Sequence, residues 1–240
     1  MIDGKKILAV VPARGGSKGI PLKNLRCIGG KPLVAIAGEV ANAVGEIDRR
    51  IVSTDHIEIA RVAKKAGLDC PFMRPEEISG DRISDWDVLI DALYKVEEID
   101  SIKYDIIVML QPTSPMRKSQ DVLGVINMLI DGGYDSVWSV SATDSKSHPY
   151  KQLIVKDGDM DYWDMRGDKI IARQQLDPVY HRNGVAYALT RECLLDQKTI
   201  KGKKAGAYII SSEQISIDTE WDLKLVEFIL AQQLNSEMNL

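Results

Sequence analysis

The stretch ILAVVPARGGSKGIPLKN spans residues 7–24 and joins an apolar run directly to a glycine-rich, basic loop. Residues 7–11 are apolar without a break, and the run stops at Pro12. An unbroken run of this kind is typical of a strand that is covered on both faces, as in a parallel sheet. Glycines allow backbone N–H groups to approach a phosphate closely. Because open α/β sheets bind ligands at the carboxyl ends of their strands, we expect this loop to hold a polyphosphate.

The same loop concentrates side chains that bind anions, namely Arg14, Ser17, Lys18 and Lys23. Arginine offers a bidentate fork, and lysine offers a mobile point charge. The loop lacks both the GxxxxGK[ST] pattern of a Walker A loop and the GxGxxG pattern of a dinucleotide-binding loop. The alternative is a basic, solvated turn. The coincidence of glycine and charge directly after the first strand favours a phosphate site instead.

Further along the chain, short apolar runs alternate with longer amphipathic segments. Strands are predicted at 50–53 and 106–110, and helices at 31–44, 56–67, 84–99 and 120–131. Ser84 and Asp87 occupy the two positions of a capping box at the start of one helix. Strand and helix in alternation predict right-handed βαβ units. The predicted fold class is therefore α/β, with a doubly wound, mostly parallel sheet.

The alternation stops near residue 145. Residues 146–182 are more polar, and an Asp157-Gly158 turn separates two short strand-like segments, as in a β-hairpin. Apolar side chains on such an arm often pack against a partner subunit. We therefore predict one domain over 1–240 with an inserted hairpin arm at about 146–182 that forms a homodimer. Strands at 185–189 and 208–210 and a helix at about 219–235 complete the prediction.

Composition limits the classes of protein to consider. The chain has 240 residues, of which 45% are hydrophobic and 28% are charged, as in ordinary globular proteins. Its net charge of −4 argues against a general nucleic-acid-binding protein. No apolar run approaches the ~18–20 residues of a membrane helix, and the amino terminus lacks a signal-peptide pattern. Three scattered cysteines without a CxxC pair fit a reducing compartment. We expect a cytoplasmic protein without nucleic-acid or membrane partners.

The loop is the first of a series of short motifs that run in order along nearly the whole chain. They are ARGGSKGIPLKN (13–24), GKPL (30–33), IVSTD (51–55), RP (74–75), LQPTSPMR (110–117), RQQL (173–176), NGVAY (183–187) and IDT (217–219). In this order they resemble the CMP-sialic acid synthetases, or acylneuraminate cytidylyltransferases. The 3-deoxy-manno-octulosonate cytidylyltransferases are more distant relatives. The resemblance implies a Rossmann-type fold like that of the nucleotide-diphospho-sugar transferases.

The resemblance also implies a reaction, in which CTP and a nine-carbon α-keto sugar acid give a CMP-sugar and pyrophosphate with Mg²⁺. The anomeric hydroxyl attacks the α-phosphate, and cations offset the charge that builds on the phosphorus and on the leaving group. Nucleotide binding is assigned to eight residues: Arg14, Gly15, Gly16, Ser17, Lys18, Lys23, Asn24 and Arg74. Catalysis is assigned to Arg14, Lys18, Lys23 and Asp218.

On the sugar side, the resemblance assigns Gln111, Thr113, Ser114, Arg173, Asn183 and Tyr187. Two prolines stiffen the turn that holds the first three. Arg173 is the candidate for the sugar carboxylate, because an Arg–carboxylate pair also sets orientation. Judged from the residues alone, the turn could be rigid but inert, and Arg173 could form a surface or interface ion pair. Tyr187 alternates with core residues, which also suits a structural role.

Two positions depart from the family pattern. The metal motif of the family is Asp-Ile-Asp-Thr, whereas this chain has Ser216 in place of the first aspartate. On a strand, this i, i+2 spacing puts both side chains on one face, where two carboxylates would hold Mg²⁺. Asp218 is the sole carboxylate that we assign to the metal. Ser216 can donate a hydrogen bond or hold a metal-bound water, but it cannot supply charge.

The second departure precedes Asn183. Relatives commonly place an arginine two residues before that asparagine, but here His181 stands there and Arg182 follows it. A shift of one residue on an extended chain points the side chain to the other face. Either His181 has taken over the role, or the backbone has a bulge, or His181 is an ordinary surface residue.

Three functions remain open from the sequence. The leading one is a cytidylyltransferase for a nonulosonic acid such as N-acetylneuraminate, legionaminate, pseudaminate or a deaminated sialic acid. The second is a nucleotidyltransferase that uses another nucleotide or a sugar phosphate. The third is a weakened, nucleotide-binding relative without catalysis, which the change at Ser216 suggests.

Overall fold

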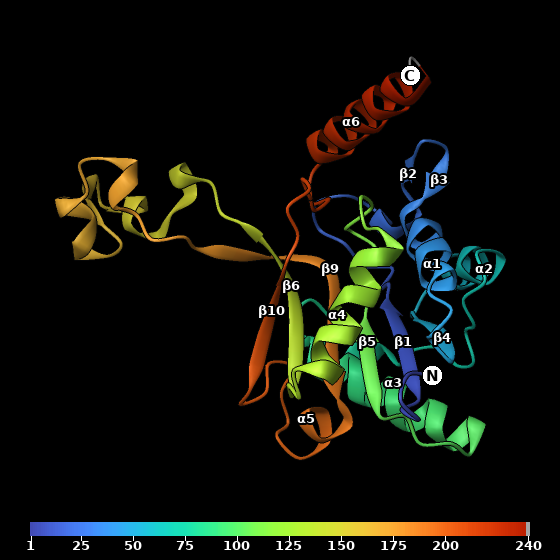
Figure 1. Ribbon diagram of the computed structural model, residues 1–240. Coiled ribbons are helices and arrows are strands. Elements are labelled where there is room, and N and C mark those ends of the chain that lie inside the picture. The colour runs from blue at the N-terminus through green and yellow to red at the C-terminus, as the bar shows by residue number, and fades with distance from the viewer. Residues whose placement is uncertain (239–240) are drawn as a thin grey trace.

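A computed structural model describes residues 1–238, with the side chains of the last helix described as far as residue 233 (Figure 1). Six strands form the central sheet: β1 (Ile7–Pro12), β4 (Arg49–Ser53), β5 (Ile106–Met109), β6 (Ser136–Ala142), β9 (Tyr180–Thr190) and β10 (Ala205–Ile209). Their order across the sheet is β10-β6-β9-β5-β1-β4. Only β9 runs antiparallel to its neighbours. The predicted mostly parallel α/β sheet is confirmed.

Helices cover both faces of this sheet. They are α1 (Leu33–Ala43), α2 (Ile57–Lys65), α3 (Asp85–Asp100), α4 (Ser119–Asp131) and α5 (Arg191–Leu195). The last helix, α6 (Glu220–Met238), lies beyond the sheet and belongs to a separate small apolar cluster (Figure 1). Residues of β1 alternate between two cores, as expected for a buried strand. Ala9 and Val11 pack with residues of α1, α2 and α4, whereas Leu8 and Val10 pack with residues of α3 and α5. No helix within residues 1–238 combines the length and the apolar content needed to cross a membrane.

Most of the predicted elements are present, within a few residues of their expected ends. The capping box is formed, because the Ser84 hydroxyl accepts from the Asp87 amide while the Asp87 carboxylate accepts from the Ser84 amide. The strand β6 was not predicted. Its serines at 136, 139 and 141 interrupt the apolar pattern, yet all three are buried. The Ser139 hydroxyl donates a hydrogen bond to the Asn183 side chain and accepts one from the Ala186 amide, both on β9. These bonds explain how a polar residue can lie inside the sheet.

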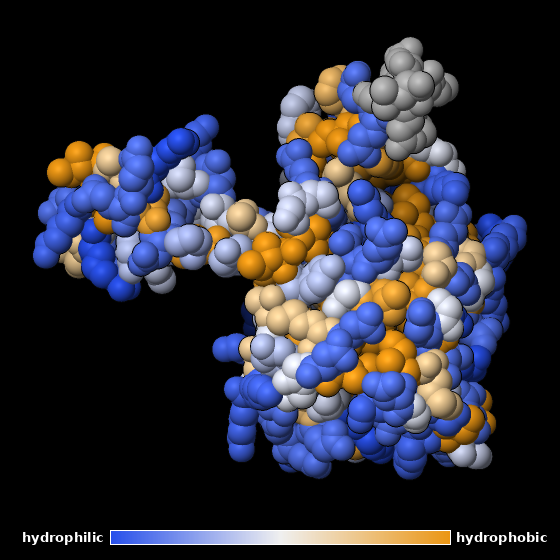
Figure 2. Space-filling model, in the orientation of Figure 1, coloured by the Kyte–Doolittle hydropathy of each residue, from blue (hydrophilic) through white to orange (hydrophobic). Residues whose placement is uncertain are grey.

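The polar segment after β6 forms an arm that projects from the sheet on the extended ends of β6 and β9 (Figure 1). Its strands β7 (Leu153–Lys156) and β8 (Asp159–Tyr162) pair as an antiparallel hairpin, as predicted. Asp157 and Gly158 both have positive φ, which a two-residue turn of type I′ requires. Apolar side chains lie on the arm surface (Figure 2). They include the exposed Leu153, Ile154, Val155, Met160, Trp163, Met165 and Ile171.

Shorter elements complete the chain. A small antiparallel pair, β2 (Cys27–Ile28) and β3 (Lys31–Pro32), follows the glycine-rich loop. Six 3-10 helices span Lys23–Leu25, Glu76–Ile78, Ser145–Ser147, Pro149–Lys151, Met165–Lys169 and Arg173–Gln175.

Candidate active site

A cavity of about 420 Å³ opens beyond the carboxyl ends of β1 and β5. This volume lies in the range of small-molecule sites. Side chains from five segments line it: the loop after β1, residues 74–83, the start of α3, the turn after β5, and residues 216–218. The predicted site residues on its wall are Arg14, Gly16, Ser17, Lys23, Asn24, Arg74, Gln111, Thr113 and Asp218. Motifs far apart in the sequence therefore meet in one place.

Side-chain hydrogen bonds hold the backbone of the glycine-rich loop in place. The amide of Gly15 donates to a carboxylate oxygen of Asp55 at 2.7 Å. Asn24 is buried and donates its side-chain amide to the carbonyl of Arg14 at 2.9 Å, so one of its polar groups already serves the loop itself. A Cβ atom on Gly19 would lie 2.5 Å from the carbonyl oxygen of Asp218. Glycine is required there because the loop and residue 218 approach so closely.

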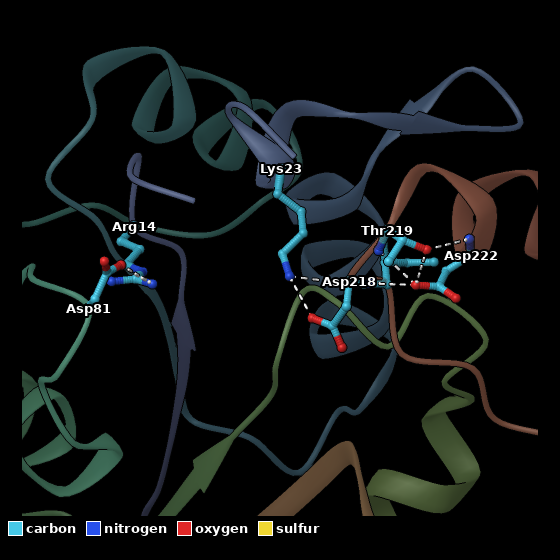
Figure 3. Close-up of polar contacts among 7 residues, drawn as sticks. Arg14, Lys23, Asp81, Asp218, Thr219 and Asp222 are labelled. Atoms are coloured by element: carbon cyan, nitrogen blue, oxygen red, sulfur yellow. Dashed lines mark hydrogen bonds and ion pairs between the residues drawn. The ribbon is translucent and has the colours of Figure 1, made fainter. Parts of the chain in front are cut away.

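Each predicted phosphate-binding cation of the loop is paired with a carboxylate. Figure 3 shows the pairs that Arg14 and Lys23 form. Arg14 Nη2 lies 2.9 Å from one oxygen of Asp81, and Lys18 Nζ lies 2.8 Å from the other. Across the site, Lys23 Nζ lies 2.9 Å from Asp218 and donates to the carbonyl of Ile217 at 2.8 Å. The hydrogen bond from Lys18 is the main cause that lowers the pKa of Asp81. No motif of the sequence indicates Asp81, because a single acidic residue in a loop carries no sequence signal.

Arg74 offers hydrogen-bond donors without partners on the cavity wall. Its residue is 6% exposed, and its backbone amide donates to Thr54 at 2.7 Å. Its Nε and Nη2 atoms are buried and have no hydrogen-bond partner in the described part of the chain. Burial lowers the pKa of Arg74, while nearby Asp55 opposes that shift. A buried guanidinium with free donors gains strongly from an acceptor supplied by a ligand.

Residues 216–218 belong to an irregular segment, so the predicted strand is wrong here. The expected geometry nevertheless holds, because Ser216 and Asp218 both line the cavity. The reason is Ile217, whose side chain is fully buried and whose amide donates to the carbonyl of Thr113 at 2.8 Å. Anchoring of the middle residue turns its two neighbours toward the cavity.

The start of α6 fixes Asp218 from the other side. The carboxylate of Asp222 accepts from the amides of Asp218 and Thr219 at 3.0 and 2.7 Å, and from the Thr219 hydroxyl (Figure 3). Burial acts to raise the pKa of Asp222, but these donated hydrogen bonds prevail and the pKa is lowered. Asp222 therefore caps the start of α6 through one of its carboxylate oxygens.

The turn after β5 is clamped by Arg117, a residue without an assigned role in the sequence analysis. Arg117 is buried and donates to three backbone carbonyls, those of Gln111, Gly184 and Val185. No carboxylate pairs with it among the described residues, and burial lowers its pKa to about 9. Gln111 and Thr113 thereby face the cavity from a rigid support. Ser114 does not line it, because its buried hydroxyl donates to the carbonyl of Asn183 at 2.8 Å.

Asn183 and Tyr187 lie behind this turn and are absent from the cavity wall. The Asn183 side chain bonds Ser139 at 2.6 Å and Ser141 at 3.0 Å. The buried Tyr187 hydroxyl accepts from the amide of Gly184 at 3.1 Å. In this structure both residues support the turn from within the sheet. Their assignment to the sugar remains a prediction.

The sheet has an irregularity at Asn183 and the three residues after it, whereas residues 180–182 pair regularly with β6. Trp138 pairs with Tyr187, but Val140 pairs with Arg182, so four residues of β9 (183–186) lie opposite one residue of β6. The guanidinium of Arg182 lies 5.3 Å from the centroid of the Trp138 ring. His181 instead contacts the Thr143 hydroxyl at 3.1 Å, near the base of the arm.

Asp85 is a further carboxylate on the cavity wall that the motifs did not indicate. It begins α3, and burial raises its pKa, while the charge of Arg182 opposes that shift. The β9 irregularity thus brings Arg182 to the side of the sheet that also holds the first turn of α3.

Arg173, Lys18 and Gly15 are not on the cavity wall. The ammonium group of Lys18 contacts Asp81, which does line the cavity. The backbone amide of Gly15 makes a hydrogen bond that helps to hold the loop. Arg173 differs, because it lies on the arm and lines a separate hollow of about 400 Å³ with residues such as Asp144 and Pro178. The structure does not bring Arg173 together with the site of its own chain.

The acidic side chains of the cavity suit only a cation that a bound ligand helps to coordinate. No cluster of three or more His, Cys, Asp or Glu side chains suitable for a metal occurs among the described residues. Asp218 is 72% exposed and lines the cavity beside the Ser216 hydroxyl. Mg²⁺ commonly binds through one or two carboxylates together with substrate phosphates and water. This donor set fits such an ion.

Comparison with known proteins agrees with this arrangement. The sequence profile of the family described as "Cytidylyltransferase" matches residues 8–237. The chain is 33% identical to "CMP-N,N'-diacetyllegionaminic acid synthase" of Legionella pneumophila, over 97% of this chain and 98% of that protein. It is 30% identical to "Post-translational flagellin modification protein B" of Campylobacter coli, over 95% and 96%.

A solved structure shares the fold. It is that of a CMP:2-keto-3-deoxy-manno-octonic acid synthetase complexed with CTP, with a TM-score of 0.71 and 22% identity. The match covers 95% of this chain and 100% of the other. Family profile, relatives of nearly equal length and fold all agree. This chain therefore belongs to the cytidylyltransferase family, in the CMP-sialic acid synthetase group that its motifs resemble.

Proposed function

We propose that this protein transfers CMP from CTP to the anomeric hydroxyl of a nonulosonic acid and releases pyrophosphate. One observation carries the proposal: cationic side chains from the loop after β1 and from residue 74 share a cavity with the polar turn after β5. A cavity with cations on one wall and a rigid polar turn on another suits a triphosphate beside a polyhydroxylated acceptor. The family and the named relatives support the same reaction.

The residues of this chain would act mainly by position and charge. Arg14 and Lys18 would bind the β- and γ-phosphates, and Lys23 would lie near the α-phosphate. Fixed cations of this kind stabilise charge that develops on a transferring phosphoryl group without having to reorganise. The unpartnered donors of Arg74 would bind acceptor atoms of the cytidine. Such buried donors discriminate strongly between nucleotides, because a base without matching acceptor atoms leaves the donors unpaired.

Asp218 and Ser216 are the residues that would hold Mg²⁺ beside the triphosphate. Bound there, the ion would neutralise phosphate charge and favour departure of pyrophosphate. Lys23 contacts Asp218 directly, so the charge of Asp218 is balanced by the protein before any ion arrives.

For the acceptor, we propose an acid of the legionaminic type. The support is the Legionella pneumophila relative, which matches over nearly the full length of both chains. Gln111 and Thr113, fixed by Arg117, would face the hydroxyl or amide groups of the sugar. A cytoplasmic location, where CTP is available, belongs to the same proposal.

The arm would complete the site of a second copy in a homodimer. Its apolar side chains are exposed in the single chain, and Arg173 on it is separated from the cavity of its own chain. Contact with a partner would bury those side chains and allow Arg173 to meet the sugar carboxylate of the partner subunit's site. A pair of Arg and carboxylate would then fix the acceptor's orientation.

Binding of nucleotides to the free protein tests the nucleotide half of the proposal. Calorimetry with CTP, UTP, GTP and ATP should show a clear preference for CTP. Arg74→Met should weaken CTP binding by about tenfold or more, as expected when a charged hydrogen bond is lost. It should leave the binding of inorganic pyrophosphate nearly unchanged. Equal affinity for all four nucleotides in the wild-type protein would contradict the assignment.

A further inference from the structure

Asp81 lies where a ligand phosphate is expected. Its two carboxylate oxygens contact two different cations of the glycine-rich loop, Arg14 at 2.9 Å and Lys18 at 2.8 Å. Figure 3 shows the Arg14–Asp81 pair at one side of the site, away from the Lys23–Asp218 pair. Asp81 also lines the cavity. A planar carboxylate thus presents two oxygens to the same donors that would hold two phosphate oxygens.

Neither cation has another acidic partner within the described part of the chain. The two cations could not bind Asp81 and a triphosphate equally well at the same time, because both acceptors need the same N–H groups. The side chains of Arg14, Lys18 and Asp81 are 33%, 83% and 39% exposed. Ion pairs this exposed are weak in water, so a polyanion can displace the carboxylate.

The segment that carries Asp81 can move without disrupting regular structure. Residues 79–84 lie in neither a helix nor a strand, between the short 3-10 helix at Glu76–Ile78 and the capped start of α3. Gly80 is exposed, and the nearest side-chain atom that a Cβ there would meet belongs to Ile83 at 3.9 Å. Little packing therefore resists a shift of this loop.

We propose that Asp81 is a positioning residue that holds Arg14 and Lys18 over the cavity in the free protein and releases them to the triphosphate. With this exchange, both cations have an anionic partner before the triphosphate binds, namely Asp81, and after it binds, namely the phosphates. It also lowers nucleotide affinity, because the displaced carboxylate remains close to the negatively charged phosphates. The same exchange in reverse promotes release of pyrophosphate. This inference rests on the proposed function, in so far as it takes a triphosphate as the ligand.

The test is the affinity of Asp81→Asn for CTP and for inorganic pyrophosphate, measured by calorimetry without sugar at low and high salt. Loss of one nearby negative charge should tighten both affinities about 3- to 30-fold at low salt, and less at high salt. Glu77→Gln is the matched control, because this exposed acid lies in the adjoining 3-10 helix and has no ion pair among the described residues. It should change either affinity less than about twofold, as for a distant solvated charge.

A double-mutant cycle separates this role from general charge effects. In a Lys18→Met background, Asp81→Asn should bring a smaller gain, because one of the two contacts to be exchanged is already gone. Unchanged or weaker binding of CTP and pyrophosphate by Asp81→Asn would overturn the proposal. Weaker binding only with Mg²⁺ present would overturn it as well, and would assign Asp81 to the ion.

The proposed function and the role of Asp81 are refuted by different results. Wild-type protein that binds neither CTP nor pyrophosphate would refute the proposed function and this inference together. Wild-type protein that binds both, with no gain from Asp81→Asn, would refute this inference alone. Melting temperatures that agree within about 3 °C for all variants would show that altered folding does not cause the differences in affinity. A shift of that size corresponds to about 1 kcal/mol.

Discussion

Lys23 Nζ lies 2.9 Å from the carboxylate of Asp218 and joins the loop after β1 to the segment before α6, 195 residues later. The carbonyl of Ile217, at 2.8 Å, holds the same ammonium group. A lysine aimed by a fixed carbonyl and balanced by a carboxylate on the cavity wall is placed before substrate binds. Positioning of this kind is what phosphoryl transfer requires of a protein.

Lys23→Met should reduce turnover at least a hundredfold while it costs the fold little. An ion pair with one exposed partner contributes about 0–1 kcal/mol to the free energy of unfolding, and Asp218 is 72% exposed. Loss of a fixed cation at a developing charge costs about 3 kcal/mol or more in the transition state. Turnover and urea unfolding measured on one preparation would check both numbers. A variant with full activity would remove Lys23 from the site.

Arg117→Met should destabilise the protein by about 3 kcal/mol, because three buried carbonyl groups lose a charged donor. The KM for the sugar acid should rise more than the KM for CTP, since Arg117 fixes the turn that carries Gln111. Lys118→Met is the matched control, because it removes the same charge from the next, exposed position. Equal effects of the two variants on unfolding would contradict a role for the buried clamp.

Ser216→Asp restores the first carboxylate of the family motif on the cavity wall. Because Ile217 anchors the segment, the new side chain should face the same space as Asp218. Turnover should be kept or increased, and half-maximal activity should need less Mg²⁺. Ser211→Asp, in the exposed part of the same segment, should leave both quantities unchanged. A loss of turnover at unchanged melting temperature would show that position 216 does not face the metal.

The arm should make the protein a dimer at micromolar concentration. Val155 and Met160 face each other across the hairpin and are 71% and 66% exposed. Val155→Asp together with Met160→Asp should yield monomers in light scattering, with the melting temperature of the sheet domain retained. A monomeric mass for the wild-type protein would contradict the proposed dimer.

Mixing of two inactive variants tests whether the arm serves the partner. If Arg173 acts in the site of the other copy, the Arg173→Ala and Lys23→Met defects of a mixed dimer both fall in the cavity of the Lys23→Met chain. The cavity of the Arg173→Ala chain then keeps its own Lys23 and receives an intact Arg173 from the partner. Subunit exchange should then restore up to about a quarter of wild-type activity, from the one intact site of each mixed dimer. No recovery in mixtures shown to contain mixed dimers would place Arg173 outside the partner's site.

The order of the elements could be predicted because the signal is local. The apolar runs that became β1, β4 and β5 are buried on both faces, and Ser84 with Asp87 forms the box that their spacing predicts. The hairpin followed from Asp157-Gly158, whose positive φ angles the turn needs. In each of these cases, neighbours in the sequence determine the geometry.

The parts that escaped prediction depend on distant partners. The strand β6 contains three serines, and two of them, Ser139 and Ser141, are satisfied by residues 183–186 of β9, while Ser136 donates to the carbonyl of Lys201. Gly184, with a φ of 72°, leaves only 2.5 Å between its missing Cβ and Gln111 Oε1, which no local pattern reveals. Asp81 and Arg117 were missed for the same reason, because the role of each lies in contacts across the fold. Nucleotide-side residues mostly meet at the cavity, whereas Asn183, Tyr187 and Arg173 do not.

The most direct test of the proposed reaction is the product formed from CTP, Mg²⁺ and a panel of nonulosonic acids. The panel includes N,N'-diacetyllegionaminic acid, N-acetylneuraminic acid and pseudaminic acid, with UTP, GTP and ATP as nucleotide controls. Pyrophosphate release and mass spectrometry are measured on the same reaction. We expect pyrophosphate and a CMP-sugar in equal amounts with at least one acid, and only when CTP is the nucleotide. Normal CTP binding without any CMP-sugar from any acid would contradict it, and would favour a nucleotide-binding relative without catalysis.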